Sequence, residues 1–447
     1  MRETRVPQTS IFDFYSEHEF GRRLEKLSRL LDEHHAIVLP LIKNDLIDTA
    51  VKNVGRCGLS VESVFRCMVL KQMRQISYDE LAFHLSDSVS YRTFTRLVGG
   101  VSPKKSSLQA TIRQIKPETL EKVFQALSLA NLNNGVISLD QIRIDSTVVS
   151  SNIAEPSDSR LLNDGVRVLS RLLAKSRDMT GVKIRYTDQR KASKSQAFRI
   201  FNAKKAEKEA LYSELLQTVR VVLKQVEKAL QIVTQEGTVS EPQKKWLQQV
   251  AHYRDLLLKV VDQTQRRVFQ GENVPSSEKI VSLFEAHTDI IVKGARDVEY
   301  GHKINVSSDA RGFITSLVIE QGNPNDADKF IPIIHHHRDT FGEVPTSTVS
   351  DGCYASRSNV HEAKALGVER VVFHKKRGLS YHDMGVKKKT FEKLRDFRAG
   401  IEGNISELKR VFGINKALWK GLDGFKAFVW SSVISYNLVR LARADSG

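Results

Sequence analysis

The sequence has little cysteine and no long run of apolar residues. Its three cysteines form no CxxC pair, so we expect neither a disulfide framework nor a thiolate zinc site, in keeping with a reducing cytosol. No apolar stretch of about 7 to 15 residues follows the first residues, which gives no support for a secretory signal. The most apolar segment, residues 425–439, is interrupted by polar side chains and falls short of the ~20 residues of a membrane span. We therefore expect a cytoplasmic protein with no membrane part.

Acidic residues are too few to balance the basic ones. Lysine and arginine total 69 against 52 for aspartate and glutamate, a formal net charge of +17. Such an excess favours nucleic acid as a partner, since each cation that neutralises a phosphate releases condensed counterions. A GxxxxGK[ST] motif is absent, so no ATP-driven step is expected. With 447 residues, 40% of them hydrophobic, the chain is an ordinary globular mixture of several domains.

Residues 1–130 are predicted to form a helical DNA-binding domain. Apolar residues recur at helical spacing over 20–31, 61–73 and 78–85, and Ser77 precedes two acids as a helix N-cap does. The basic residues of this region fit either a helix-turn-helix-like DNA reader or a helical bundle with a solvated basic face, and the sequence leaves both open. These residues are Arg92, Arg96, Lys104, Lys105, Arg113 and Lys116.

Residues 156–290 are predicted to be a helical insertion. Two apolar stripes, over 211–230 and 246–261, are separated by residues 237–242 and indicate an antiparallel helical hairpin. A basic stretch upstream contains Arg190, Lys191 and Lys194. A charge run is usually a solvated face, but here it also fits a surface that tracks DNA.

Residues 135–155 and 291–447 are predicted to form one α/β domain with a mixed sheet. Around 142–147 apolar and polar residues alternate, which indicates a strand. Strands are also expected at 303–307, 313–320, 345–350 and 368–373, with a hairpin turn at 309–312. Helices are expected at 358–366, 389–412 and 422–443. Three strands in a meander followed by β-α-β give a mixed sheet covered by helices.

Two aspartates stand where such a sheet would bring them together. Asp145 lies in the middle of the first strand and Asp351 follows the fourth, and ligands tend to bind at the carboxyl ends of parallel strands. Asp140 and Asp309 are better explained as residues at a strand start and in a turn. The three consecutive histidines at 335–337 point in different directions on a helix, so we do not expect them to bind a metal.

A third carboxylate can come from the helix at 389–412. At about 100° per residue, Arg398, Glu402 and Lys409 fall on one narrow face of that helix. Taken alone, Arg398 and Glu402 are better explained as a surface pair worth about 0.3–0.5 kcal/mol.

Together these three stretches resemble the DDE transposases of bacterial insertion sequences. The matching pieces are Asp145 within Ile-Asp-Ser-Thr-Val, Asp351 within Ser-Asp-Gly-Cys-Tyr, and Arg398, Glu402 and Lys409 in the pattern Y-x2-R-x3-E-x6-K. The resemblance looks closest to ISNCY-type elements and covers most of the chain. The sequence departs from the pattern once, because its tyrosine position holds Arg395.

The resemblance implies an RNase H-like catalytic domain interrupted by the helical insertion, and a metal-dependent reaction. Asp145, Asp351 and Glu402 would hold two Mg²⁺ ions, for which Mn²⁺ would substitute, since Mg²⁺ prefers oxygen ligands. Water would cut the DNA at the element end, and the freed 3′-OH would then attack target DNA. Arg398 and Lys409 would hold phosphates.

Double-stranded DNA, as element ends and as target, is the expected partner. His302 and Lys303 begin the strand beside the first one and are further candidates for DNA contact. Because two element ends must be joined, we expect at least a homodimer when the protein is bound to DNA. We expect it in the bacterial cytoplasm, associated with the nucleoid. Two alternatives remain open: a non-catalytic DNA-binding regulator or inactive relic of an element, and a stand-alone RNase H-like nuclease.

Overall fold

The computed structural model describes residues 4, 15, 17–47, 58–97, 102–235, 240–293, 297–374 and 378–444, in two compact units. The first comprises Met1–Ser150 and His302–Gly447, and the second comprises Ser151–Gly301. We describe each unit by itself. In the described residues, no helix is both long enough and apolar enough to cross a membrane.

The first unit begins with helices, as the sequence predicts. The structure confirms Ser77 as an N-cap: its hydroxyl accepts from the Glu80 N–H and the Glu80 carboxylate accepts from the Ser77 N–H, which together form a capping box. The helices are α1 (Glu19–Glu33), α2 (His35–Leu46), α3 (Val61–Arg74), α4 (Tyr78–Asp87), α5 (Val89–Phe94), α6 (Lys105–Ile112) and α7 (Pro117–Asn133).

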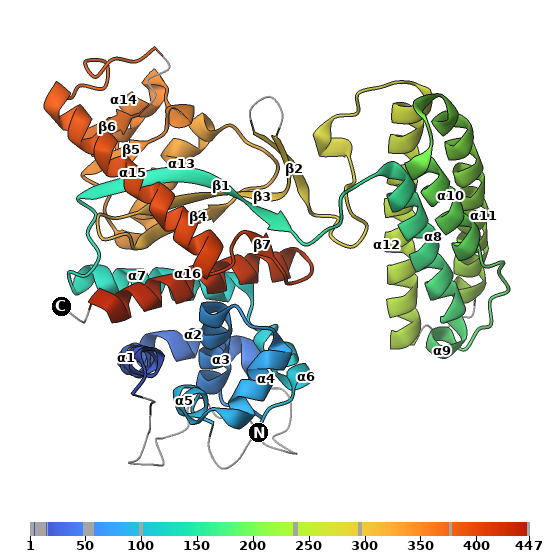
Figure 1. Ribbon diagram of the computed structural model, residues 1–447, viewed down its shortest axis with the longest axis horizontal. Coiled ribbons are helices and arrows are strands. Elements are labelled where there is room, and N and C mark those ends of the chain that lie inside the picture. The colour runs from blue at the N-terminus through green and yellow to red at the C-terminus, as the bar shows by residue number, and fades with distance from the viewer. Residues whose placement is uncertain are drawn as a thin grey trace. The chain divides into compact units, whose positions relative to one another are not determined.

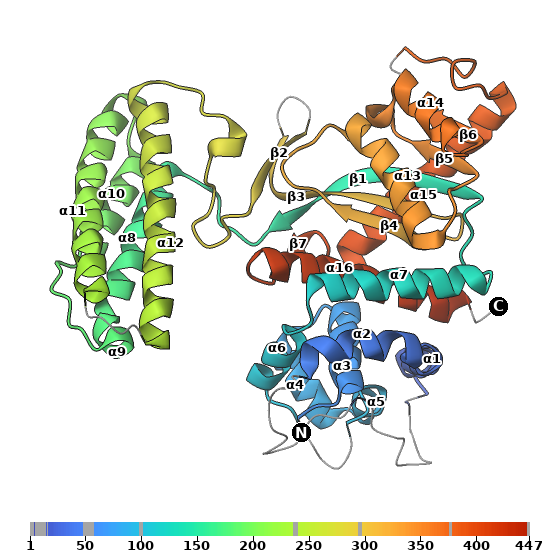
Figure 2. The ribbon, with the colours of Figure 1, turned by 180° about the vertical axis from the view of Figure 1, so that it is seen from behind.

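These helices share a core with the end of the chain. Helix α16 (Leu422–Ala444) lies beside α7, and both lie between the sheet and α1–α6 (Figures 1 and 2). The Gln72 amide on α3 donates to the Ser431 hydroxyl at 2.8 Å and to the Phe428 carbonyl at 3.3 Å. Helices α1–α7 are therefore packed with the C-terminal helix α16 around a common apolar core.

The sheet of the first unit is mixed. Its strands are β1 (Gln141–Ser151), β3 (Asp297–Ser308, from His302 onward in this unit), β4 (Ile314–Ile319), β5 (Ser347–Ser350), β6 (Arg370–Phe373) and β7 (Lys416–Ala417). Their order is β4-β3-β1-β5-β6, with β7 also on β1, and β5 runs parallel to both β1 and β6. The predicted hairpin between β3 and β4 is confirmed, and Gly312 supplies its left-handed residue at φ +80°.

Helices cover this sheet. They are α13 (Phe330–Phe341), α14 (Arg357–Ala365) and α15 (Lys388–Val411), with short 3₁₀ turns η4 (Asp326–Lys329) and η5 (Gly352–Tyr354). Helix α15 crosses the face of β1 (Figure 1). The predicted strands and helices of this region are thus confirmed to within a few residues, and the fold is mixed α/β, mostly helical around a mixed sheet.

The second unit is a helical bundle with a short hairpin of strands. Its elements are α8 (Asp158–Ala174), α9 (Ser176–Thr180), α10 (Arg190–Asn202), η1 (Lys205–Glu207), α11 (Lys208–Thr234), α12 (Glu241–Thr264), η2 (Gln265–Phe269), η3 (Ser276–Glu278) and β2 (Asp289–Lys293). Strand β2, which the sequence did not indicate, pairs antiparallel with residues 297–301 of β3.

The predicted helices of the insertion are confirmed, but they form more than a hairpin. Ser240 caps α12 through a capping box with Gln243, and Pro242 stands in the first turn. Helices α8 and α10 complete the bundle: the Trp246 indole N–H donates to the Leu172 carbonyl at 2.8 Å, which ties α12 to α8. Part of the predicted separator, residues 237–239, lies outside the described residues.

Candidate active site

The register of the sheet brings two of the expected acids together. Strands β1 and β5 are parallel, and Ile144 pairs with Ser350. One residue further along each strand come Asp145, within β1, and Asp351, just after β5 and before η5. Asp145 and Asp351 therefore emerge side by side where β5 ends, at the carboxyl edge of a parallel pair.

Arg398 links the first of these acids to Glu402. Its guanidinium donates to Asp145 Oδ2 at 3.1 Å and to Glu402 Oε1 at 3.0 Å. The Arg398 side chain is 11% exposed and that of Glu402 is 66% exposed. Asp145 and Glu402 line an open pocket of about 560 Å³ together with Lys409. Residues from β1 and α15, more than 250 positions apart, thus share one site.

Asp145 is held in a setting that disfavours its charge. Burial, opposed by Arg398 and the Ser146 N–H and reinforced by Asp351 and Glu402, raises the pKa of Asp145 from 3.8 to about 6. Two neighbouring carboxylates that raise the pKa of a third are a cluster that a cation would stabilise. Perturbed acids of this kind gather at functional sites.

Asp145→Asn is expected to stabilise the metal-free protein at pH 8. A carboxyl whose pKa is higher when folded favours folding in its protonated form, so its ionised form costs the folded state up to about 3 kcal/mol above pH 6. The advantage of the variant is expected to shrink as the pH falls from 6 toward 4. Thermal unfolding in chelator at pH 8 and pH 4.5 measures it.

The matched control is Asp140→Asn, an exposed acid at the start of the same strand. It should change the unfolding temperature little at either pH. An Asp145→Asn protein that is less stable than wild type at pH 8 would contradict the prediction.

The carboxylate oxygens of this site are chemically suitable ligands for a divalent cation. Asp351 Oδ1 is buried and has no hydrogen-bond partner, which is costly unless another group binds it. Carboxylate oxygens are what Mg²⁺ and Mn²⁺ take. Across the described residues, no three His, Cys, Asp or Glu side chains already stand together as one ligand set, and Arg398 lies between Asp145 and Glu402.

Two of the expected DNA-contact residues are corrected by the structure. His302 is 3% exposed and its ring packs edge-on against Phe425 at 4.7 Å. Lys303 is 8% exposed, and its ammonium pairs with Asp326 at 2.5 Å and donates to the Pro324 carbonyl. Side chains buried in this way cannot meet DNA phosphates, so we remove both from the expected contact surface.

The other basic candidates lie at the surface to different degrees. Lys191 and Lys194 are exposed on α10, in the second unit. Arg190 is 40% exposed but its guanidinium is held by both oxygens of Asp188 at 2.6 to 2.9 Å. Arg395, at the tyrosine position of the pattern, is exposed and pairs with Asp396.

In the helical N-terminal region, several basic residues are engaged within the protein. Arg96 pairs with Asp32 at 2.7 Å, and Lys116 pairs with Asp45 at 3.6 Å. The Arg113 guanidinium donates to the Lys420 carbonyl at 3.1 Å. These pairings account for part of the basic charge without DNA.

Sequence reasoning missed several residues that line the pocket. Ser406, one turn after Glu402 on α15, could have been found from the helical spacing of Glu402 and Lys409. Asn415, from the loop before β7, carries no signal in the sequence. Of the three consecutive histidines, His337 is a core residue: it is buried and bonded to Ser307 and Thr315.

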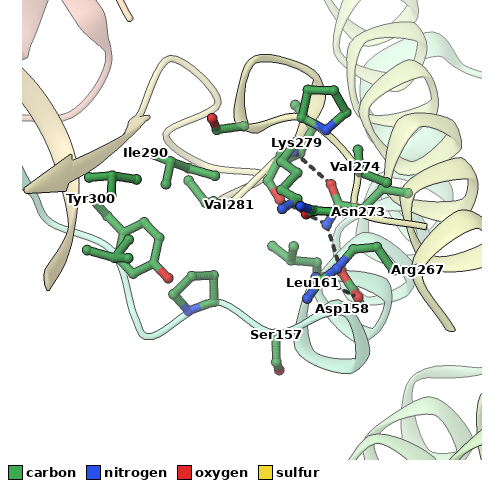
Figure 3. Close-up of a pocket in the computed structure, with 17 residues that line it drawn as sticks. Ser157, Asp158, Leu161, Arg267, Asn273, Val274, Lys279, Val281, Ile290 and Tyr300 are labelled. Atoms are coloured by element: carbon green, nitrogen blue, oxygen red, sulfur yellow. Dashed lines mark hydrogen bonds and ion pairs between the residues drawn. The ribbon is translucent and has the colours of Figure 1, made fainter. Parts of the chain in front are cut away.

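A second pocket, of about 480 Å³, lies within the second unit (Figure 3). Both oxygens of its buried acid, Asp158, have partners: Gln263 donates to one at 2.6 Å and Arg267 to the other at 2.9 Å. Burial and the nearby Arg267 charge lower the pKa of Lys279 at its rim. A single satisfied carboxylate does not make a phosphoryl-transfer site.

Comparison with known protein families indicates which kind of enzyme contains this site. Residues 278–438 match the Transposase DDE domain, and residues 12–113 match the Transposase domain (DUF772). The chain carries a transposase DDE domain, and its function is that of a transposase. It catalyses DNA transposition by phosphoryl transfer, and its DDE domain implies an RNase H-like core. No curated protein and no solved structure matches the chain significantly.

The matched segments contain two of the three acids predicted from the sequence. Asp351 and Glu402 fall within the DDE match, whereas Asp145 lies outside both matches. The pairing of β1 with β5 places Asp145 beside Asp351, and Arg398 links Asp145 to Glu402.

Proposed function

We propose that this transposase moves an insertion sequence, with Asp145, Asp351 and Glu402 as its acidic triad. It binds the terminal inverted repeats, cleaves a strand at each element end and transfers the freed 3′-OH end into target DNA. A homodimer holds the two ends, and the element is of the ISNCY type. The observation that carries the proposal is the pairing of β1 with β5, joined to Glu402 through Arg398.

DDE transposases use divalent metal ions. Asp145, Asp351 and Glu402 would hold two Mg²⁺ ions, or Mn²⁺ in their place. When bound, such ions polarise the attacking and leaving oxygens of an in-line displacement. Without them, the Arg398 guanidinium balances the charge of Asp145 and Glu402 and keeps the two side chains together. Lys409, on the wall of the same pocket, is placed to hold a phosphate as a point charge.

The parts of the chain divide the work in this proposal. Residues 1–130 bind DNA, residues 135–155 with 291–447 form the catalytic domain, and residues 156–290 are an insertion. Support for a DNA-tracking role of the insertion comes from Lys191 and Lys194, which are exposed on one helix that has no acidic residue in its first turn.

The test uses the purified transposase and duplexes that carry the DNA on either side of its gene. We expect nicking at the element end with Mg²⁺ or Mn²⁺, none in chelator, and joined products when target DNA is added. Cleavage without joining would identify a stand-alone nuclease, and binding without cleavage would identify a regulator or relic.

The variant Glu402→Gln tests whether the cleavage and joining reactions take place at this site. It is expected to slow cleavage and joining by about 10²- to 10³-fold, because it removes a charge that acts on the reacting groups. Asp396→Asn, which changes an exposed acid on the same helix, is the control and should leave both rates near wild type. Equal rates for Glu402→Gln and wild type would refute the triad.

A further inference from the structure

A buried arginine joins the strand of the first acid to the helix of the third. Arg143 on β1 is 7% exposed. Its guanidinium donates to the Ser308 hydroxyl at 2.9 Å, to the Phe397 carbonyl at 3.2 Å and to Asn404 Oδ1 at 3.1 Å. It also lies 4.8 Å from the centre of the Phe397 ring. Two of its three hydrogen bonds and its ring contact are therefore made with α15.

Gly400 makes this close approach possible. A Cβ at position 400 would lie 1.6 Å from Arg143 Nη1 and 2.5 Å from its Cζ. A Cβ at Gly403, one turn further along the same helix, would have no atom within 4 Å. The absence of a side chain is thus required at Gly400 and not at Gly403.

The arginine belongs to a fully bonded polar network. Asn404, 3% exposed, accepts from both Arg143 and the Ser308 hydroxyl, and its amide donates to the Tyr436 hydroxyl at 2.8 Å. The Tyr436 hydroxyl donates in turn to the Gly312 carbonyl at 3.0 Å. A buried network in which each member has a partner is rigid and specifies one arrangement of its elements.

We propose that Arg143 is a positioning residue that sets the rotation of α15 and thereby the place of Glu402. The proposal rests on the proposed function, in which Glu402 is the third acid. Phe397, Gly400 and Asn404 recur at three and four residues, so they form one face of α15, and Glu402 lies about 140° around the helix from Phe397.

A small rotation of α15 is enough to displace the Glu402 carboxylate from its place in the site. Side-chain tips lie about 6 Å from a helix axis, so a rotation of about 10° moves the Glu402 carboxylate by ~1 Å. A misplacement of that size can cost about 10² in rate. Arg143 and Asp145 are two residues apart and project from the same face of β1. One strand thus carries the first acid and locates the helix of the third.

The two glycines give a matched test in the full-length protein. Gly400→Ala is expected to push aside the Arg143 guanidinium, the far end of a flexible side chain, so the protein should still fold. We expect Mn²⁺ affinity without DNA, measured by electron paramagnetic resonance, to fall about 10-fold toward that of Glu402→Gln. Single-turnover cleavage at saturating DNA should slow about 100-fold with an unchanged Kd for DNA. Gly403→Ala should match wild type in all three measurements.

A second pair of variants separates positioning from mere packing. Arg143→Leu has a side chain too short to reach position 400, so adding Gly400→Ala to it should cause no further loss of cleavage or Mn²⁺ affinity. Additive losses would overturn the proposal, as would equal behaviour of Gly400→Ala and Gly403→Ala. Wild-type cleavage by Glu402→Gln is a different outcome, because it refutes the triad itself whatever the glycines do.

Discussion

Asp351→Asn is expected to lower the rate of DNA cleavage by about 10³-fold while DNA binding is retained. Asp351 follows β5 beside Asp145, and its Oδ1 is buried without a hydrogen-bond partner. An amide has the same shape but no charge with which to attract a cation. We therefore expect the variant to fold but to bind the catalytic metal ion weakly. Single-turnover cleavage of an element-end duplex with Mg²⁺, together with the Kd of the same duplex in chelator, measures both parts.

The control for this change is Asp339→Asn on α13, whose side chain is 73% exposed. It removes the same charge from the surface and should leave the cleavage rate near wild type. If Asp351→Asn cleaved within a few-fold of the control, Asp351 would have no part in the reaction.

Arg66→Met is expected to lower the free energy of unfolding of the helical N-terminal region by about 3–5 kcal/mol, the usual cost of breaking a buried ion pair. The Arg66 side chain on α3 is 1% exposed and pairs with Glu62 at 2.9 Å and with Asp32 at 3.0 Å. It also donates to the Ser28 hydroxyl and the Phe94 carbonyl. Methionine fills similar space but leaves buried acceptors and the Glu62 carboxylate without this cation. Thermal and urea unfolding followed by circular dichroism measure the loss.

Arg74→Met, in the last turn of the same helix, is the comparison. Its guanidinium lies over the Phe20 ring at 4.6 Å, a contact worth about 0.5–1 kcal/mol at an exposed position. A loss for Arg66→Met no larger than that for Arg74→Met would show that the buried network contributes little.

Local pattern was enough for most elements and for the choice of acids. The alternation around Asp145 predicted its strand, and the short segment 345–350, ended by Asp351 and Gly352, predicted β5, because side-chain period and turn residues are local properties. The parallel pairing that brings the two together followed from the expected strand order. The spacing of Arg398, Glu402 and Lys409 likewise needed only the geometry of one helix.

Burial and partners could not be predicted in the same way. His302 and Lys303 were correctly placed on a strand beside β1, yet both are buried, because Phe425 covers one and Asp326 neutralises the other. Arg398 looked like half of a surface pair, but its second carboxylate, Asp145, comes from a strand 253 residues away. Such contacts depend on which distant elements pack together, and the periodicity of residues along one helix or strand does not contain that information.

The sequence alone determined the helical and strand segments, the excess of basic charge and the three acids that match the DDE pattern. Only the tertiary structure decided that Arg398 lies between two of those acids and that a glycine at position 400 leaves room for the Arg143 side chain. It also decided which basic side chains are buried and which face solvent. The physical reason is that secondary structure follows from neighbours along the chain, whereas burial and charge pairing are set by contacts between residues that the fold brings together.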